Sequence, residues 1–304
     1  MEDKYAIYFD NVSKDYGDSR GNFDINLGVK EGKTLGLVGE NGAGKTTLLR
    51  QAMGFVKSDH GKIHIYDLDA YKQAHLCKAY VGYVPGEINF PDVKTGNEFL
   101  RQYASELRLG PDSFQRADEV IRRMQLDVTA YPRRMSKGMK QKTAIVAALM
   151  RKAPILLLDE PTTGLDPLMR DEFLRLLEEE KSRGATIIMS SNTIEELEKV
   201  ADEVAFISKG RIIDVADVNK IRNRPIREYK VEFNSYNDYA AIRSLYHGKV
   251  IRDQKQFCQL SLSIDKSECA KLFADLEGKD VKFISQIPYN LQSYFDQRRN
   301  ELGD

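Results

Sequence analysis

The residues best suited to do chemistry lie in one glycine-rich stretch between Gly39 and Thr47. Their spacing matches the GxxxxGK[ST] pattern of a phosphate-binding loop. Glycines let the backbone curl so that successive N–H groups point at one anion, and a following helix adds the positive end of its dipole. Lys45 can then reach the β- and γ-phosphates, and the Thr46 hydroxyl can bind Mg²⁺. The sequence therefore predicts a nucleotide-binding site.

Two adjacent carboxylates, Asp159 and Glu160, could complete such a site. They follow the apolar run 155–158, which is typical of a buried strand. Beside a phosphate-binding loop, an aspartate in this place suits a contact to the Mg²⁺ shell. A glutamate one residue later is placed to orient or deprotonate the water that attacks the γ-phosphate. Without the loop, the pair would be read as solvent-facing carboxylates at a strand end.

The elements that must position these residues alternate between strand and helix patterns. This predicts an α/β fold with a doubly wound, mostly parallel sheet. Ligands bind at the carboxyl ends of the strands in such a sheet, where both the loop and Asp159 fall. We expect strands at 5–9, 25–29, 34–38, 62–66, 79–84, 155–160, 186–190 and 204–207, and helices at 46–53, 168–183 and 193–200.

The pattern changes to helical spacing from Val93 to Met150, with expected helices at 99–107, 114–124 and 139–150. Pro132 breaks the chain between the second and third of these helices. Further on, the run 178–181 of three glutamates and a lysine reads as a solvated helix face. The segment 88–150 is therefore expected to be a helical insertion into the α/β domain.

A second domain is expected after residue 221, where the pattern changes and Asn223-Arg224-Pro225 resembles a linker. The predicted domains are 1–221, which binds the nucleotide, and 222–304, a small α+β module. The elements of the module follow the order β-α-β-β-α-β of a ferredoxin-like unit. A last helix is expected at 291–300.

Composition limits the kinds of partner. The 304-residue chain has 46 Lys+Arg and 46 Asp+Glu, a formal net charge of zero, which argues against a nucleic-acid-binding surface. Its three cysteines lack metal-ligand spacing and fit a reduced, cytoplasmic chain. No apolar stretch approaches the roughly 18 residues needed to span a bilayer. Any work at a membrane would therefore need a partner.

Four further segments, together with the loop, resemble the ATP-binding subunit of an ABC transporter. Met135–Gln141 resembles the signature motif, and Thr163–Asp166 resembles the D-loop. Tyr16 lies where the family has its adenine-stacking aromatic, although on local sequence alone it could equally be a loop tyrosine without a ligand. Residues 82–85 resemble the lead into the Q-loop. The similarity spans about 4–215, and the Ser-Lys-Gly-Met signature is most similar to ATPases of drug, bacteriocin, antibiotic-resistance and sodium exporters.

The resemblance implies a P-loop NTPase fold with an ABC-type helical subdomain at about 88–150 and an antiparallel β subdomain. It also implies ATP and Mg²⁺ as cofactors, with Thr46 and Asp159 at the metal. The implied catalytic residues are Glu160 and Asn192. The implied nucleotide-binding residues are Tyr16, Gly39, Glu40, Asn41, Gly42, Ala43, Gly44, Lys45, Thr46, Thr47, Ser136, Lys137, Gly138 and Asp166.

Two positions depart from the family pattern. The Q-loop glutamine falls at Gly86, which has no side chain to touch Mg²⁺ or the water, so that Glu87 substitutes for it or the contact is absent. The switch histidine falls at Asn192, and asparagine can donate a hydrogen bond but cannot carry a proton.

The family mechanism implies that two subunits pack head to tail, as a homodimer or as a heterodimer with another cassette. Each ATP would lie between Gly39–Thr47 of one chain and Ser136–Gly138 of the other. An integral membrane permease would feel the dimer open and close, which places the chain in the cytoplasm at the inner face of the cell membrane. The alternative is an ATP-gated regulatory cassette with little or no turnover.

Other classes of nucleotide-binding protein fit less well. Residues 219–222 are not the Asn-Lys-x-Asp motif of a signalling GTPase. No long coiled coil of a chromosome-type ATPase is present, and only one cassette is found where a translation-factor ABC protein would have two.

Overall fold

The computed structural model describes residues 4–302 of the chain, with side chains described up to Arg298. The chain divides into two compact units between Asp217 and Val218. The boundary expected from the sequence, 221/222, falls slightly later, at the end of helix α8 (Val218–Arg222).

A sheet of six strands forms the centre of the first unit: β3 (Thr34–Val38), β6 (Val81–Val84), β7 (Ile155–Asp159), β8 (Thr186–Ser191), β9 (Glu203–Ser208) and β10 (Arg211–Asp217). Their order is β10-β9-β3-β8-β7-β6. All neighbours pair in parallel except β10, which is antiparallel to β9. The expected mostly parallel sheet is confirmed. β3, β7 and β8 are buried along their whole length, which is why their sequences are continuous apolar runs.

A second, antiparallel sheet contains β1 (Tyr5–Asp15), β2 (Gly21–Lys30), β4 (His60–Ile65) and β5 (Leu68–Asp69), in the order β2-β1-β4-β5. This is the antiparallel β subdomain implied by the family resemblance. Strands β1 and β2 are longer than expected, because Ser13 pairs with His60 and Lys14 pairs with Asn22.

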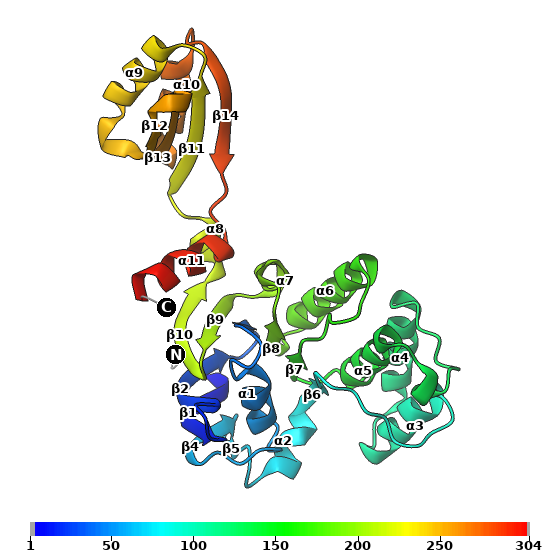
Figure 1. Cartoon of the computed structure of the whole chain (residues 1–304). Coiled ribbons are helices and arrows are strands. Elements are labelled where there is room, and N and C mark those ends of the chain that lie inside the picture. The colour runs from blue at the N-terminus through cyan, green and yellow to red at the C-terminus, as the bar shows by residue number, and fades with distance from the viewer. Residues whose placement is uncertain (1–3, 303–304) are drawn as a thin grey trace. The chain divides into compact units, whose positions relative to one another are not determined.

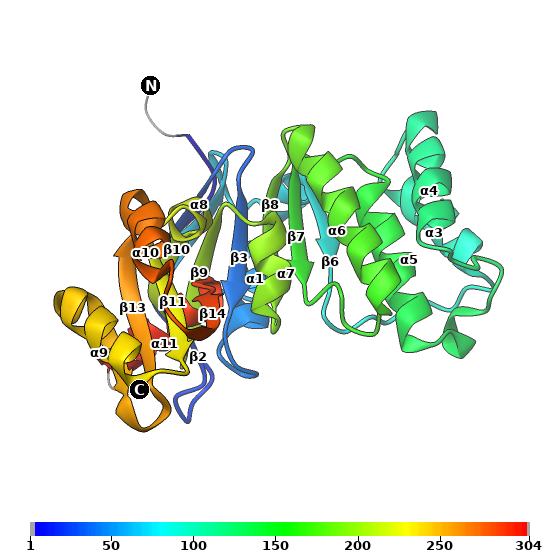
Figure 2. The same ribbon diagram turned by 90° about the horizontal axis from the view of Figure 1, so that it is seen from above.

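Four helices accompany the sheets of the first unit: α1 (Lys45–Ala52), α2 (Ala74–Tyr80), α6 (Pro167–Ser182) and α7 (Ile194–Val200). Leu48 and Leu49 of α1 share one apolar core with residues of both sheets, among them Phe9 and Leu157. Helices α6 and α7 lie on the face of the six-stranded sheet opposite the one that α1 covers (Figures 1 and 2). This two-sided covering is the doubly wound arrangement that the sequence predicted.

Two stretches of this unit were misread from the sequence. The strand expected at 79–84 begins only at Val81, because Ala79 and Tyr80 end helix α2. In that helix Cys77 is buried in the core, and the Tyr80 ring packs edge-on against Tyr66 with ring centroids 5.4 Å apart. Strand β10 was not predicted at all, because its exposed edge position leaves it with few buried apolar residues.

The segment between β6 and β7 forms the expected helical insertion, with α3 (Gly96–Glu106), α4 (Pro111–Arg123), the short 3₁₀ helix η1 (Pro132–Arg134) and α5 (Lys137–Leu149). Thr95 and Ser136 cap α3 and α5, each accepting a hydrogen bond from a first-turn N–H. Within the first unit these helices lie at the end of the six-stranded sheet away from the antiparallel sheet (Figure 1).

A buried ion pair ties the helical insertion to α6, contrary to the solvated face expected at 178–181. Glu180 is only 3% exposed, and its Oε1 lies 2.8 Å from Nη2 of Arg116 on α4. Arg183 also pairs with Glu180. The expectation was wrong for Glu180, because the periodicity of a charged run does not reveal a cation on a distant helix.

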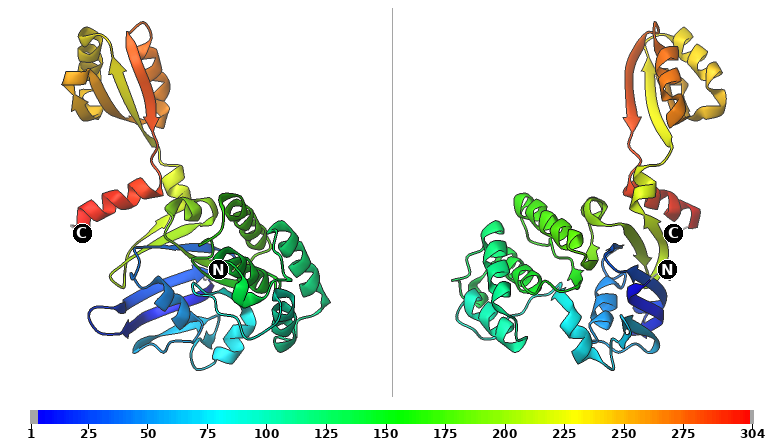
Figure 3. Two further views of the ribbon diagram at one scale, coloured as in Figure 1. Left: turned by 45° about the vertical axis from the view of Figure 1, so that its right-hand side comes forward. Right: turned by 180° about the vertical axis from the view of Figure 1, so that it is seen from behind.

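The second unit has the expected element order β-α-β-β-α-β. After α8 come β11 (Ile226–Phe233), α9 (Tyr236–Leu245), β12 (Val250–Gln254), β13 (Gln259–Asp265), α10 (Cys269–Leu276) and β14 (Val281–Ile287), with short 3₁₀ turns at 247–249, 255–257 and 266–268 and a last helix α11 (Leu291–Leu302). The sheet order is β12-β13-β11-β14, with all pairs antiparallel. Helices α9 and α10 pack against this sheet (Figure 3). Their buried residues, such as Tyr239 and Leu272, share one core with Val231 and Leu260 of the sheet.

In the described part of the chain, no helix is long and apolar enough to cross a membrane.

Candidate functional site

The phosphate-binding loop joins the carboxyl end of β3 to the start of α1 at Lys45 (Figure 2). Gly42 and Gly44 have φ of 82° and 111°, in the region that disfavours side chains. A Cβ on Gly44 would also lie 2.2 Å from Oδ1 of the buried Asn22 on β2. The loop can therefore keep this tight path only with glycine at position 44. Glu40, Asn41 and Gly42 are exposed at its tip, whereas Ala43 is buried.

The Lys45 side chain is only 4% exposed and folds back over the loop. Its Nζ donates hydrogen bonds to the Gly39 carbonyl oxygen at 2.6 Å, to the Glu40 carbonyl oxygen at 3.1 Å and to Asn192 Oδ1 at 2.9 Å. Burial lowers the pKa of the Lys45 ammonium, and the nearby carboxylates of Glu160 and Asp159 only partly oppose this effect. The cation is thus held at the place where phosphate oxygens would meet it.

Asp159 ends β7 beneath the first turn of α1 and is fully buried. Its Oδ1 accepts hydrogen bonds from Thr46 Oγ1 at 3.1 Å and from Ser190 Oγ at 2.8 Å. Its Oδ2 is buried and accepts no hydrogen bond from the described residues. These residues meet because β7 pairs with β8, and β8 pairs with β3, the strand that leads into the loop.

Glu160 follows Asp159 with a φ of 46°, a left-handed conformation that strains a non-glycine residue. Its backbone N–H donates to Ser190 Oγ at 2.9 Å, and its Oε1 accepts a hydrogen bond from Asn192 Nδ2 at 2.9 Å. Lys45 Nζ lies 4.0 Å from the same oxygen. The amide of Asn192 therefore bridges the loop lysine and the carboxylate, one through its oxygen and the other through its nitrogen.

The remaining residues expected at the nucleotide are spread more widely. Tyr16 is 55% exposed after β1, with the Lys14 ammonium 5.5 Å from its ring centroid. Thr47 is half-buried in the first turn of α1. Asp166 caps α6, where its Oδ1 accepts a hydrogen bond from the Met169 N–H at 2.9 Å.

The signature-like residues lie at the start of α5 and contact parts of their own chain other than the loop. Ser136 Oγ accepts a hydrogen bond from the Met139 N–H at 3.2 Å. Gly138 lies so close to the D-loop-like segment that a Cβ there would be 2.6 Å from the Gly164 carbonyl oxygen. Lys137 also packs near Gly164. Within the described residues, no hydrogen bond or ion pair joins these signature-like residues to Gly39–Thr47.

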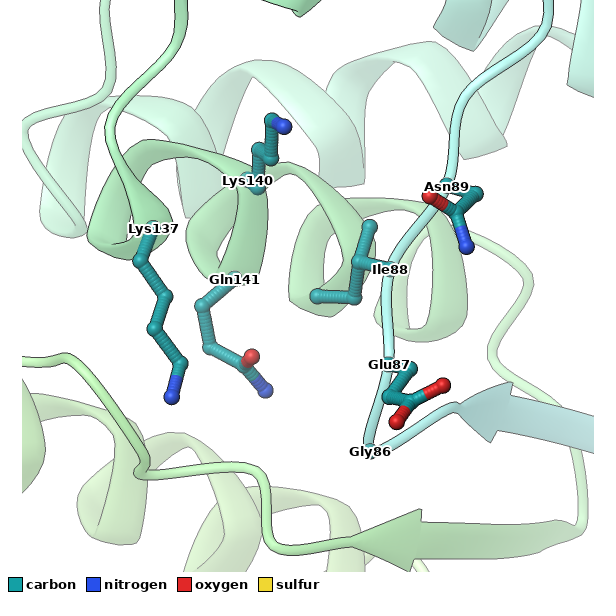
Figure 4. Close-up of a pocket in the computed structure, with 7 residues that line it drawn as sticks. All are labelled: Gly86, Glu87, Ile88, Asn89, Lys137, Lys140 and Gln141. Carbon is teal, nitrogen blue, oxygen red and sulfur yellow. The ribbon is translucent and has the colours of Figure 1, made fainter.

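A pocket of about 430 Å³ lies between α5 and the segment that follows β6. Figure 4 shows Lys137 and Gln141 projecting from α5 toward it, opposite Gly86 and Glu87. Gln141 is 2% exposed, and its Nε2 has no partner among the described residues. Glu87 makes no hydrogen bond or ion pair in the described part of the chain. Of the two residues at the departure from the Q-loop pattern, Glu87 therefore lines a pocket formed with α5, whereas Gly86 also lies against Asp159.

Two residues of the site were missed by sequence reasoning. Ser190 contacts both Asp159 and Glu160, and Asn22 lies under Gly44. A signal for Ser190 was present, because polar residues that end an apolar strand pattern lie at the ligand-binding edge of a parallel sheet. For Asn22 there was no local signal, since its role depends on the contact between two sheets.

The fold and these contacts define a P-loop nucleotide-binding cassette with an inserted helical subdomain. The family model described as "ABC transporter" matches residues 23–163. Across 97% of its length the chain is 32% identical to the Bacitracin transport ATP-binding protein BcrA of Enterococcus faecalis, of which it covers 96%. The chain therefore belongs to the ABC transporter family.

Other relatives and solved structures agree with this assignment. The chain is 32% identical to the Linearmycin resistance ATP-binding protein LnrL of Bacillus subtilis (strain 168), over 78% of this chain and 79% of that protein. A solved ATP-binding subunit of an ABC transporter is 27% identical and superposes with a TM-score of 0.67, over 72% of this chain and 92% of that one. A bacterial ABC transporter cassette solved as a dimer shares the fold, with 23% identity and a TM-score of 0.63 over 70% of this chain and 98% of that one.

Proposed function

We propose that this chain binds and hydrolyses ATP with Mg²⁺ and thereby powers a separate integral membrane permease that works as an exporter. One relative that matches nearly the full length is named for bacitracin transport, and another relative is named for linearmycin resistance. The observation that carries the proposal is the set of contacts linking Lys45, Asn192 and Glu160 at the carboxyl edge of the sheet. This set combines a phosphate-binding cation, a polar amide and a carboxylate base in one place.

Binding of ATP would exchange contacts that Lys45 now makes within the chain. The phosphates would lie in the loop Gly39–Thr47, against its N–H groups and the start of α1. Lys45 would then bond phosphate oxygens instead of the Gly39 and Glu40 carbonyl oxygens. Tyr16, exposed after β1, would stack on the adenine ring, because aromatic faces are good platforms for bases.

The residues present fit a magnesium ion. Asp159 Oδ2 is a buried carboxylate oxygen without a protein partner, and Thr46 Oγ1 lies 3.1 Å from the other oxygen of the same carboxylate. Oxygen ligands suit Mg²⁺, which is usually bound by one or two protein groups together with phosphates and water. When bound, the ion would neutralise charge that develops on the phosphate oxygens. Thr46 and Asp159 would hold it, and Ser190 would orient Asp159.

Glu160 would act as the general base. The water oxygen forms a bond to the γ-phosphorus, the bond from that phosphorus to the bridging oxygen of ADP breaks, and the water proton passes to the Glu160 carboxylate. Before this step, Asn192 must release Glu160 Oε1 or share its amide with the γ-phosphate. Asn192 would then hold the phosphate by a neutral donor.

We also propose that the active form is a head-to-tail dimer, either of two copies or with another cassette. Among the described residues, Ser136, Lys137 and Gly138 make no hydrogen bond or ion pair with the loop of their own chain, so we expect them to bind the ATP of a second subunit. In that dimer the N–H groups at the start of α5 would add to the grip on the γ-phosphate. Through its permease the subunit would work in the cytoplasm, at the inner face of the cell membrane. Residues 222–304 would act as an accessory module.

One observation favours a second candidate, an ATP-gated regulatory cassette with little turnover. Asn192 occupies Glu160 Oε1 with a neutral hydrogen bond and cannot itself carry a proton. Phosphate release by the purified chain, measured with and without its membrane partner, separates the two candidates. Hydrolysis in either preparation supports the ATPase, and its absence from both supports the regulator.

The variant Glu160→Gln tests the catalytic proposal. It keeps the size of the side chain but removes the base, so ATP should still bind while hydrolysis stops and the ATP-held dimer accumulates. Size-exclusion chromatography with ATP and a phosphate-release assay measure both effects. Glu178→Gln, on the exposed face of α6, is the matched control. A monomeric profile at high concentration with ATP bound would contradict the dimer, and undiminished hydrolysis would contradict the role of Glu160.

A further inference from the structure

Gly86, two residues after the end of β6, lies directly against Asp159. A Cβ built on Gly86 would lie 2.8 Å from Asp159 Oδ2 and 3.2 Å from Asp159 Cγ. Real Cβ atoms essentially never approach another heavy atom as closely as 2.8 Å. The backbone conformation at Gly86 is not the reason for glycine, because its φ lies outside the left-handed region. What excludes a side chain here is the Asp159 carboxylate.

Asp159 cannot turn away from such a side chain without breaking other contacts. Its Oδ1 is fixed by hydrogen bonds from Thr46 on α1 and Ser190 on β8, and the residue is 0% exposed. Only Oδ2, the oxygen that faces Gly86, accepts no hydrogen bond from the described residues. A carboxylate oxygen buried in this way needs a hydrogen-bond donor or a cation, because a buried polar atom without a partner is costly.

Glu87, the next residue in the chain after Gly86, makes no hydrogen bond with Asp159 among the described residues. Glu87 lines the pocket opposite Lys137 and Gln141 of α5 (Figure 4). It forms no hydrogen bond or ion pair within the described residues. In the segment after β6, Gly86 thus lies against Asp159, whereas Glu87 lines the pocket beside α5.

We propose that Gly86, because it has no side chain, leaves room beside Asp159 Oδ2 for a water bound to the magnesium ion. The inference rests on the magnesium site proposed above. Magnesium keeps several of its waters when it binds to proteins, and a water can donate to the buried oxygen. A side chain at position 86 would displace that water or push Asp159 off its hydrogen bonds. Restoring the glutamine of the family pattern at position 86 should therefore damage the site instead of repairing it.

The test uses Gly86→Ala and Gly86→Gln in the full-length chain, with Gly110→Ala as the matched control. Gly110 is an exposed glycine of the same unit, and a Cβ there would meet nothing within 4 Å. Titration calorimetry gives the dissociation constant of ATP with Mg²⁺ and with EDTA, and their ratio is the magnesium-dependent gain in affinity. We expect both Gly86 variants to lose about 10–100-fold of this gain, the range seen for residues that support metal ligands. Affinity in EDTA and the behaviour of Gly110→Ala should match those of the unchanged protein.

The outcomes separate this inference from the proposed function. If magnesium raises the ATP affinity of the unchanged protein and raises that of Gly86→Gln equally, the inference is wrong but the proposed magnesium site stands. No gain in the unchanged protein would overturn the magnesium site and, with it, the inference. If Gly86→Gln does not fold, Gly86→Ala decides, since it adds only a methyl group and its φ is allowed. Thermal unfolding in EDTA shows whether each variant is folded before the metal is added.

Discussion

Asn192→His is the substitution that bears most directly on turnover. Asn192 lies between Lys45 Nζ and Glu160 Oε1, at 2.9 Å from each, and is the residue that would meet the γ-phosphate beside the base. A protonated imidazole would place a charged donor where the chain now has a neutral one. Glu160 would still be present to accept the proton of the attacking water. We therefore expect the unchanged protein to hydrolyse ATP slowly, and Asn192→His to hydrolyse it faster.

The size of the gain follows from the strength of one hydrogen bond. A charged donor bonds roughly twice as strongly as a neutral one. Exchanging a bond worth about 1.5 kcal/mol for one twice as strong stabilises the transition state by about 1.5 kcal/mol, which is about tenfold in rate. Because Lys45 and the glycine-rich loop, which would bind the phosphates, are unchanged by the substitution, ATP affinity should change little. The gain should be largest below about pH 6.5, where histidine is protonated, and should fade as the pH rises.

Steady-state phosphate release with Mg²⁺ and ATP, measured across this pH range, is the assay. Asn237→His, on the exposed surface of α9, introduces the same side chain away from the site and should leave the rate unchanged. If Asn192→His leaves the rate of hydrolysis unchanged or lowers it at every pH, the site works best with asparagine at this position and the reasoning is wrong. A gain that does not depend on pH would refute the role of the charge.

Two further predictions concern Lys45 and the buried ion pair. Lys45→Ala should abolish ATP binding. In the unchanged protein, the affinity for ATP should fall as the pH rises through the pKa of Lys45, which is lowered from its ordinary value of 10.5. The sign follows because phosphate favours the charged ammonium, so binding takes up a proton where the free Lys45 has begun to lose its own. Calorimetry showing constant affinity and no proton uptake as the pH rises toward 10.5 would contradict it. Glu180→Gln should destabilise the protein by about 3 kcal/mol, the low end for breaking a buried pair, because Glu119 still lies 2.8 Å from Arg116. Urea unfolding measures this loss against the exposed control Glu178→Gln, and equal midpoints for the two variants would show that the pair contributes nothing.

The sequence by itself determined the chemistry of the site and most of the architecture. The spacing of Gly39, Gly44, Lys45 and Thr46 is local, so it predicts a strand, a tight turn and a helix without knowledge of the rest of the chain. Continuous apolar runs such as 155–158 are equally local and predict buried parallel strands. The alternation of helices and strands also predicted the order of elements in the second unit.

Only the tertiary structure decided which side chains meet. The bridge from Lys45 through Asn192 to Glu160 joins the ends of β3, β7 and β8, and the sequence does not reveal that these strands are neighbours. The approach of Gly86 to Asp159 and the pairing of Glu180 with Arg116 arise in the same way. Periodicity reports how one segment alternates between core and solvent, whereas these contacts depend on the distance between segments far apart in the chain. That distance is set only when the sheets and helices pack together.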